Sequence, residues 1–194
     1  MSAIKNILFS GVGGQGILLA SELTAAALLQ VGYDVKKSEV HGMAQRGGSV
    51  TAQLRYGERV YSPLIDPGTA DIQMAFEMME AVRYLPYLNQ DSTVIVNTQK
   101  ILPPAVATGQ AVYPENVLDE LEKRDIRVIG VDAFSIAKEA GEVRTANVAL
   151  VGALSVHLEV DVQVFESIIE QRVPQRFLKE NMKAFAGGRE AGGR

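Results

Sequence analysis

Residues 4–16 read IKNILFSGVGGQG, an apolar run that leads directly into a glycine-rich turn. Residues 4–9 are typical of a buried parallel strand, because both faces of such a strand are covered by apolar neighbours. A long amphipathic helix is predicted after the turn and is expected to end at Gly32. Residues 33–40 read as a second strand. The first forty residues therefore predict a strand–helix–strand unit with a right-handed crossover.

The chain then departs from a plain alternation. Residues 50–54 alternate apolar and polar side chains, which is the period of a half-exposed strand. After a turn at residues 56–59, residues 60–62 are expected to return as the second strand of an inserted antiparallel hairpin. Further strands are predicted at residues 71–76, 92–97 and 126–131, and further helices at residues 77–85, from Pro114, and at residues 147–158, 161–172 (with Asp161 as N-cap) and 174–185.

The predicted class is α/β: a mostly parallel, Rossmann-like sheet in three layers, with the inserted antiparallel hairpin and a helical C-terminus. We expect residues 1–194 to form a single domain. Residues 186–194 are glycine-rich and are predicted to be a flexible tail.

Composition excludes several classes of protein. The 194 residues carry a net charge of −4, which argues against a general nucleic-acid binder, because such a protein needs a basic face. There are no cysteines and only two histidines, so iron–sulfur clusters, disulfides and metal centres are not expected on this chain. No leader is visible, and residues 17–31, the longest apolar region, contain polar residues that argue against a membrane span. We expect a cytoplasmic protein without nucleic-acid or membrane partners.

The glycine turn is the first candidate site. Its spacing fits G-x-G-x-x-G between a strand and a helix, where backbone amides and the helix N-terminus favour an anionic group such as a phosphate. The candidate cofactor-binding residues here are Gly11, Gly13, Gly14, Gln15 and Gly16. The alternative is a tight turn that binds nothing. Binding of NAD would need an acidic residue at the end of the second strand, for which Glu39 is available.

The second candidate site is the polar loop that follows residue 40. We expect it to face the glycine turn, because ligands of α/β sheets lie outside the carboxyl ends of the strands and both segments leave such ends. Arg46 can bind a phosphate or carboxylate through two hydrogen bonds, and His41 can donate or carry a proton. The candidate catalytic residues are His41, Gln45 and Arg46, and the candidate cofactor-binding residues are Gly47, Gly48 and Ser49. The alternative is a surface loop with a solvated arginine.

Two glutamates one helical turn apart, Glu77 and Glu80, form an acid pair. We expect them to stabilise a helix N-terminus rather than to act in catalysis. His157 is expected to be a packing or surface residue.

Taken together, residues 11–17 and 38–50 resemble the gamma-type domain of the 2-oxoacid:ferredoxin oxidoreductases, and in particular its indolepyruvate branch. Residues 61–65, 84–88, 94–98 and 147–154 fit the same domain, so the resemblance covers nearly the whole chain. It adds Asn147 to the candidate cofactor-binding residues.

The resemblance implies a subunit that is inactive alone. A larger alpha subunit is expected to carry thiamine diphosphate, Mg and 4Fe-4S clusters. The complex would decarboxylate indolepyruvate or another aryl 2-oxoacid, transfer the acyl group to coenzyme A and reduce ferredoxin. Coenzyme A could contact this chain, and the hairpin near residues 56–57 with the loop at residues 63–67 could form the subunit interface.

Two other functions remain open at this point. The chain could be a stand-alone NAD(P)-dependent oxidoreductase or a nucleotide sensor, because a fold does not fix a function. It could also be a scaffold in which the glycine turn is purely structural.

Overall fold

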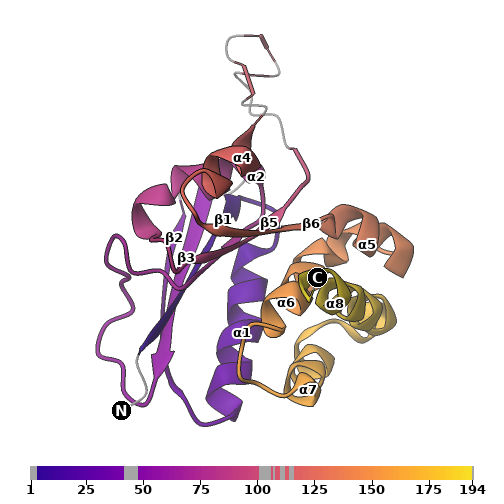
Figure 1. The fold of residues 1–194 in the computed structure, drawn as a ribbon. Helices are drawn as coiled ribbons and strands as arrows, with labels where there is room; N and C mark the ends of the chain where they lie inside the picture. Colours follow the sequence, from indigo (N-terminus) through magenta and orange to yellow (C-terminus); the bar gives the residue numbers. More distant parts are fainter. Residues whose placement is uncertain are drawn as a thin grey trace.

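A computed structural model describes residues 4–41 (the backbone alone at residue 41), 48–100, 106, 108–109, 112–113 and 116–193. Its centre is a six-stranded sheet with the strand order β2-β3-β1-β4-β5-β6, covered by helices on both faces (Figure 1). The strands are β1 (Lys5–Val12), β2 (Asp34–His41), β3 (Ser49–Gly57), β4 (Ile72–Ala75), β5 (Thr93–Asn97) and β6 (Arg127–Val131).

Strands β1, β4, β5 and β6 are parallel to one another, whereas β3 runs antiparallel to both β1 and β2. The mostly parallel α/β class is therefore confirmed. The inserted antiparallel element is also present, but its pairing differs from the prediction. Residues 60–62 are not a strand, and β3 lies instead between β2 and β1 over its full length, with Lys5 opposite Tyr56 and Val12 opposite Ser49. Pairing on both sides buries β3, which a two-stranded hairpin at the edge would leave exposed.

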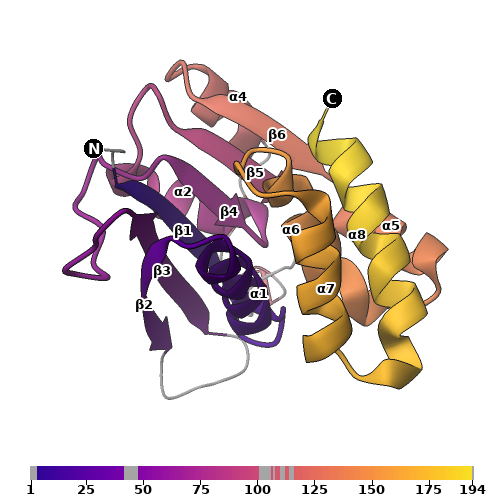
Figure 2. The same cartoon turned by 90° about the horizontal axis from the view of Figure 1, so that it is seen from below.

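Seven α-helices lie in the part of the chain that the structure describes: α1 (Ile17–Gln30), α2 (Met78–Arg83), α4 (Val117–Glu122), α5 (Ala133–Ala140), α6 (Ala146–Ser155), α7 (Val162–Arg172) and α8 (Leu178–Gly192). Figure 2 shows α1, α5, α6, α7 and α8 on one face of the sheet and α2 and α4 on the other. The two faces have separate apolar cores, one centred on Phe9 and Phe165 and one on Leu8 and Leu121. Three layers result, as predicted.

Most predicted helices are present near their expected places, and Asp161 caps α7 as expected, accepting a hydrogen bond from the amide of Gln163. The start predicted at Pro114 lies outside the described residues. Helix α5 was not predicted, although Asp132 caps its first turn and Gly141 follows it in the left-handed conformation. These two residues are the ordinary signals of a helix start and a helix end.

The end of the chain differs from the predicted frayed tail. Helix α8 continues to Gly192, because its glycines allow it to pack directly on the buried helix α6. A Cβ atom on Gly188 would lie 1.8 Å from the carbonyl oxygen of Ala149, and one on Gly192 would lie 2.6 Å from the Cα atom of Ala153. These glycines therefore set the distance between the two helices.

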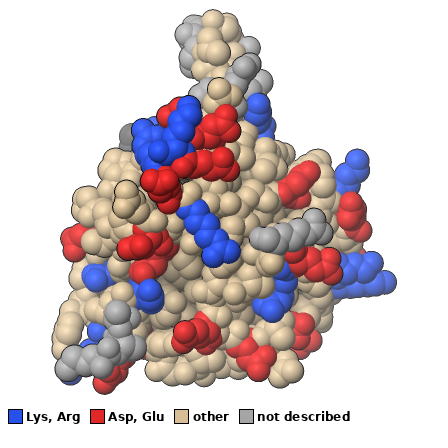
Figure 3. Space-filling view, viewed as in Figure 1, with Lys and Arg blue, Asp and Glu red and all other residues tan. Residues whose placement is uncertain are grey.

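Figure 3 shows acidic and basic side chains interspersed over the visible face. No helix among the described residues is long and apolar enough to cross a bilayer.

Candidate functional site

The glycine turn connects β1 to α1 at the carboxyl edge of the sheet. Gly14 and Gly16 have φ angles of 104° and 77°, in the region that only glycine adopts readily. Gln15 secures the turn: its Oε1 accepts a hydrogen bond from the amide of Val12 at 2.6 Å, and its Nε2 donates to the carbonyl of Phe76 at 3.0 Å. The Gln15 side chain therefore ties the turn to the end of β4.

The first glycine of the motif has a different role from the one predicted. Gly11 lies inside β1 rather than in the turn, opposite Val50 of β3. A Cβ atom there would lie 2.7 Å from both Gln15 Oε1 and Phe76 Cβ. Gly11 therefore makes room for the side chain that secures the turn.

Asn147, at the start of α6, is brought against the turn from 131 residues away in the sequence. Its Nδ2 donates to the carbonyl of Gly16 at 3.4 Å, and its side chain is buried. A Cβ atom on Gly16 would lie 2.4 Å from that Nδ2 atom. Gly16 thus lets α6 approach the N-terminus of α1, and Asn147 holds the turn in place.

The end of the polar loop that follows β2 contacts the glycine turn, as predicted. The amide of Gly13 donates to the carbonyl of Gly48 at 2.8 Å, and Ser49 pairs with Val12 across β3 and β1. His41, at the end of β2, pairs through its backbone with Val50, at the same edge of the sheet. Gln45, Arg46 and Gly47 lie outside the described residues, as does the side chain of His41.

Gly13 and Gln15, two of the candidate cofactor-binding residues, use their amides inside the protein. Because the amide of Gly13 bonds to Gly48 and that of Gln15 bonds to Val12, neither points to a ligand. The amides of Gly14 and Gly16 donate to no acceptor among the described residues. They lie at the N-terminus of the 14-residue helix α1, which has no acidic residue in its first turn. The anion-binding capacity of the turn therefore rests on these two amides and the first turn of α1.

A cavity of about 380 Å³ opens beside the turn, at the carboxyl ends of the parallel strands. Its apolar wall is formed by Phe76, Phe134 and Leu150, and its polar groups come from Asn97 and Gln99 after β5. This volume lies in the range of small-molecule sites. Sequence reasoning missed these residues, although Asn97 ends the clearest predicted strand.

Arg144 is the cation at the rim of this cavity. Its guanidinium donates to both carboxylate oxygens of Glu142, at 3.0 and 2.7 Å, and its carbon atom Cζ lies 4.8 Å from the ring centre of Phe177. These hydrogen bonds lower the pKa of Glu142 to about 2. The charge of Arg144 is thus already balanced by Glu142.

The acid pair stabilises its helix, as predicted. Glu77 is the N-cap of α2 and accepts from the amide of Met79 at 2.7 Å, and it also bonds the hydroxyl of Tyr113. The Tyr113 pKa is raised, mainly by burial and then by this carboxylate.

Glu80 is buried and holds the start of β3. It accepts from the Ser49 hydroxyl at 2.7 Å and from Arg83 Nε at 2.9 Å. The Ser49 hydroxyl, a predicted cofactor ligand, is therefore already bonded inside the protein.

The dinucleotide hypothesis does not fit this sheet. In a dinucleotide-binding domain the acidic residue stands at the end of the strand next to the glycine turn. Here β3 separates β2 from β1, so Glu39 is two strands away from the turn, roughly 10 Å by ordinary strand spacing. Its carboxylate is paired with Lys37.

The fold and the site together define an α/β domain with a small cavity and two available amides at the carboxyl edge of its sheet. Residues 6–191 match the family of pyruvate ferredoxin/flavodoxin oxidoreductases. The chain is 43% identical to indolepyruvate oxidoreductase subunit IorB of Archaeoglobus fulgidus over 187 residues, which cover 94% of this chain and 92% of that protein. The chain therefore belongs to the pyruvate ferredoxin/flavodoxin oxidoreductase family, and it is one subunit of a hetero-oligomeric 2-oxoacid:ferredoxin oxidoreductase.

The fold also occurs in solved structures. Pyruvate oxidoreductase subunit PORC of Thermotoga maritima superposes with a TM-score of 0.74 at 24% identity, covering 96% of each chain. The 2-oxoglutarate:ferredoxin oxidoreductase of Magnetococcus marinus, solved with 2-oxoglutarate, coenzyme A and succinyl-CoA bound, gives a TM-score of 0.76 at 18% identity. It covers all of this chain but only 32% of the other, so the same fold also occurs as part of a longer polypeptide.

Proposed function

We propose that this chain is the non-cluster subunit of an indolepyruvate:ferredoxin oxidoreductase. The observation that carries the proposal is the 43% identity to an indolepyruvate oxidoreductase subunit over nearly the full length of both chains. The complex would decarboxylate indolepyruvate or another aryl 2-oxoacid, join the acyl group to the thiol of coenzyme A, release CO₂ and pass two electrons to ferredoxin.

The redox groups would belong to a larger partner subunit. The sequence contains no cysteine, so it has no thiolate for a 4Fe-4S cluster. Thiamine diphosphate, with Mg, would be held by that partner and would supply the carbanion chemistry of the decarboxylation. The residues of this chain are left with binding, orientation and the exclusion of water.

The glycine turn would hold an anionic group of a substrate, for which coenzyme A is our candidate. Supporting this role, the amides of Gly14 and Gly16 lie at the N-terminus of α1, next to an apolar cavity wall. An anion at these amides is favoured by the helix dipole, and a neutral arm would lie against Phe76 and Phe134. Arg46 would add a bidentate contact from the loop.

The first experiment is anaerobic affinity capture of the tagged chain from its native extract, followed by mass spectrometry and an iron assay. We expect a larger, cysteine-rich, thiamine-binding subunit. The complex is then assayed with indolepyruvate, phenylpyruvate, 2-oxoisovalerate and pyruvate, with reduction of ferredoxin as the readout. A chain recovered alone and without iron, or a complex that prefers pyruvate, would refute the proposal.

The role of the turn is tested on the same complex. Arg46→Ala is expected to raise the KM for coenzyme A without lowering the melting temperature of the subunit. Arg172→Ala, which removes an exposed arginine at the end of α7, serves as the matched control. Unchanged kinetics in Arg46→Ala would refute the assignment of the loop.

A further inference from the structure

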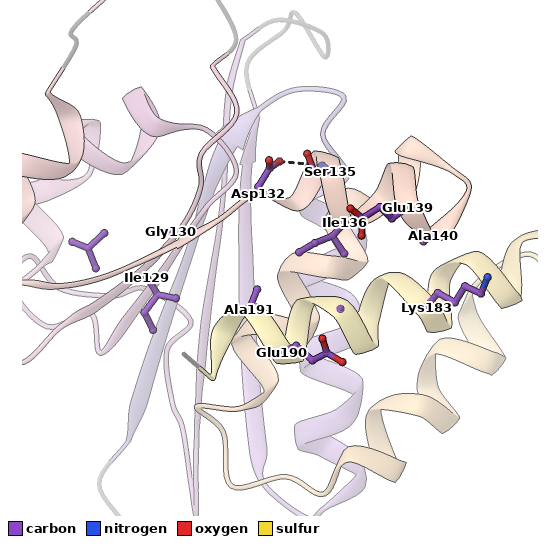
Figure 4. A pocket seen from close by; sticks show the side chains of 12 residues that line it. Ile129, Gly130, Asp132, Ser135, Ile136, Glu139, Ala140, Lys183, Glu190 and Ala191 are labelled. Carbon is purple, nitrogen blue, oxygen red and sulfur yellow. Dashed lines mark hydrogen bonds between the residues drawn. The ribbon is translucent and has the colours of Figure 1, made fainter.

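A cavity of about 670 Å³ lies away from the glycine turn, between the edge strand β6 and the helices α5 and α8. Figure 4 shows Ile129 and Gly130 at one end of it, Ser135 and Glu139 of α5 along one side, and Lys183 and Glu190 of α8 along the other. Nothing in the proposed chemistry uses this groove.

The backbone of β6 faces this groove with hydrogen-bonding groups that the sheet does not use. The amide of Thr98, directly after β5, donates to the carbonyl of Val131 at 3.0 Å, so the backbone N–H and C=O of Val131 point toward β5. The N–H and C=O of one residue in a strand point to the same side, and successive residues alternate. Ile129 therefore faces β5 as well, whereas Val128 and Gly130 point their amides and carbonyls to the free edge.

This edge has little of the usual protection, because Arg127 at its start is the one charged residue of β6. Exposed edge strands normally carry lysine, proline or a bulge that prevents another strand from pairing with them. The other edge of the sheet, β2, follows this rule with Lys36 and Lys37. β6 reads RVIGV, and Gly130 is exposed with no side chain to block an approaching strand.

The charge of the groove indicates what would occupy it. Its wall carries the carboxylates of Asp132, Glu139 and Glu190 against the single ammonium of Lys183. All four are exposed, and none forms an ion pair with another described residue. An occupant with lysine or arginine side chains would complement this excess of negative charge.

We propose that an extended, basic segment of the larger partner subunit adds to the sheet along β6, pairing with the backbone of Val128 and Gly130 and placing its cations against Glu139 and Glu190. Addition of a strand takes its affinity from backbone hydrogen bonds and its specificity from the side chains that enter the adjacent groove. The inference rests on the proposed function, because that function supplies the partner.

The test compares two substitutions at one position. Gly130→Ala and Gly130→Pro both add a Cβ atom, which would lie 3.2 Å from Thr98 Cγ2, but only proline removes the outward N–H. Proline is tolerated at an edge position whose N–H faces outward, so both variants are expected to fold. Loss of this donor and the bulk of the proline ring should weaken binding of the purified larger subunit roughly tenfold, whereas alanine should stay within about twofold.

Two further readouts locate the contact. Amide hydrogen exchange in the complex should slow at Val128 and Gly130, with Ile129 already protected in the free chain by β5. The double variant Glu139→Lys/Glu190→Lys should weaken binding and reduce its salt dependence, whereas Glu122→Lys, on α4 and outside the groove, should not.

The outcomes separate the two proposals. If the wild-type chain binds the larger subunit and Gly130→Pro binds equally well, strand addition is wrong and the proposed function stands. If the wild-type chain does not bind that subunit at all, both proposals fall. If Gly130→Pro instead abolishes self-association of the free chain, the occupant is a second copy and the partner assigned here is wrong.

Discussion

The contact between Gly16 and Asn147 makes a quantitative prediction for the substitution Gly16→Ala. The φ of 77° costs a residue with a side chain about 1–2 kcal/mol. The new Cβ atom would also lie 2.4 Å from Asn147 Nδ2, and overpacking of this kind costs typically 1–3 kcal/mol. We expect a loss of about 3 kcal/mol in the free energy of unfolding, or roughly 6–12 °C in melting temperature for a chain of this size.

Gly14→Ala is the matched control. Gly14 also has a positive φ, but a Cβ atom there would meet nothing within 4 Å. It should therefore lose only the backbone part, about 1–2 kcal/mol.

Urea denaturation followed by circular dichroism gives both values, and a double-mutant cycle isolates the contact. Asn147→Ala removes the amide that the new methyl would strike. The double variant should therefore be less destabilised than the sum of the single ones, by about 1–2 kcal/mol. Equal losses of unfolding free energy for Gly16→Ala and Gly14→Ala would show that Asn147 of α6 does not contact the turn as described. So would a double variant whose loss equals the sum of the single ones within about 0.5 kcal/mol.

Three further predictions concern other contacts. Gly188→Ala should destabilise the chain by about 3 kcal/mol or more, because its Cβ atom would strike the carbonyl of Ala149, whereas Gly193→Ala, with its nearest atom at 3.4 Å, should be nearly neutral in urea denaturation. Ser49→Ala should cost about 1–3 kcal/mol, because it leaves the buried Glu80 carboxylate without its hydroxyl donor; a cost near zero would contradict the network. Burial lowers the pKa of His157 below its ordinary value, so the unfolded chain binds the proton more tightly and stability falls as the pH drops below about 6.5. His157→Gln should flatten this part of the profile of melting temperature against pH, and an unchanged slope would refute the assignment.

The parallel part of the fold could be predicted from the sequence because its strands are short apolar runs bounded by turn residues. The position of β3 could not, because pairing with β1 depends on tertiary contacts rather than on the nearest strand in the sequence. The glycines of α8 predicted a flexible tail where the structure has a helix, for a related reason. Glycine lowers helix propensity, but packing on α6 overrides that preference.

The candidate site was predictable in part. The glycine spacing located the turn, and its meeting with Gly48 followed from the carboxyl-edge rule. Which amides are already hydrogen-bonded could not be predicted, since the amide of Gly13 donates to the carbonyl of Gly48, which is 35 positions further along the chain. The cavity wall was missed because Phe134 lies on α5, the helix that was not predicted.

The direct packing of α8 on α6 has a consequence for the synthesis of this protein. Helix α6 is buried along its length, and α8, which covers one side of it, is translated later. A nascent chain that ends before α8 exposes an apolar helix and cannot complete the larger of the two cores. The larger core can therefore close only once α8 has emerged from the ribosome, and chains that stall or are truncated before α8 should be substrates for chaperones and proteases.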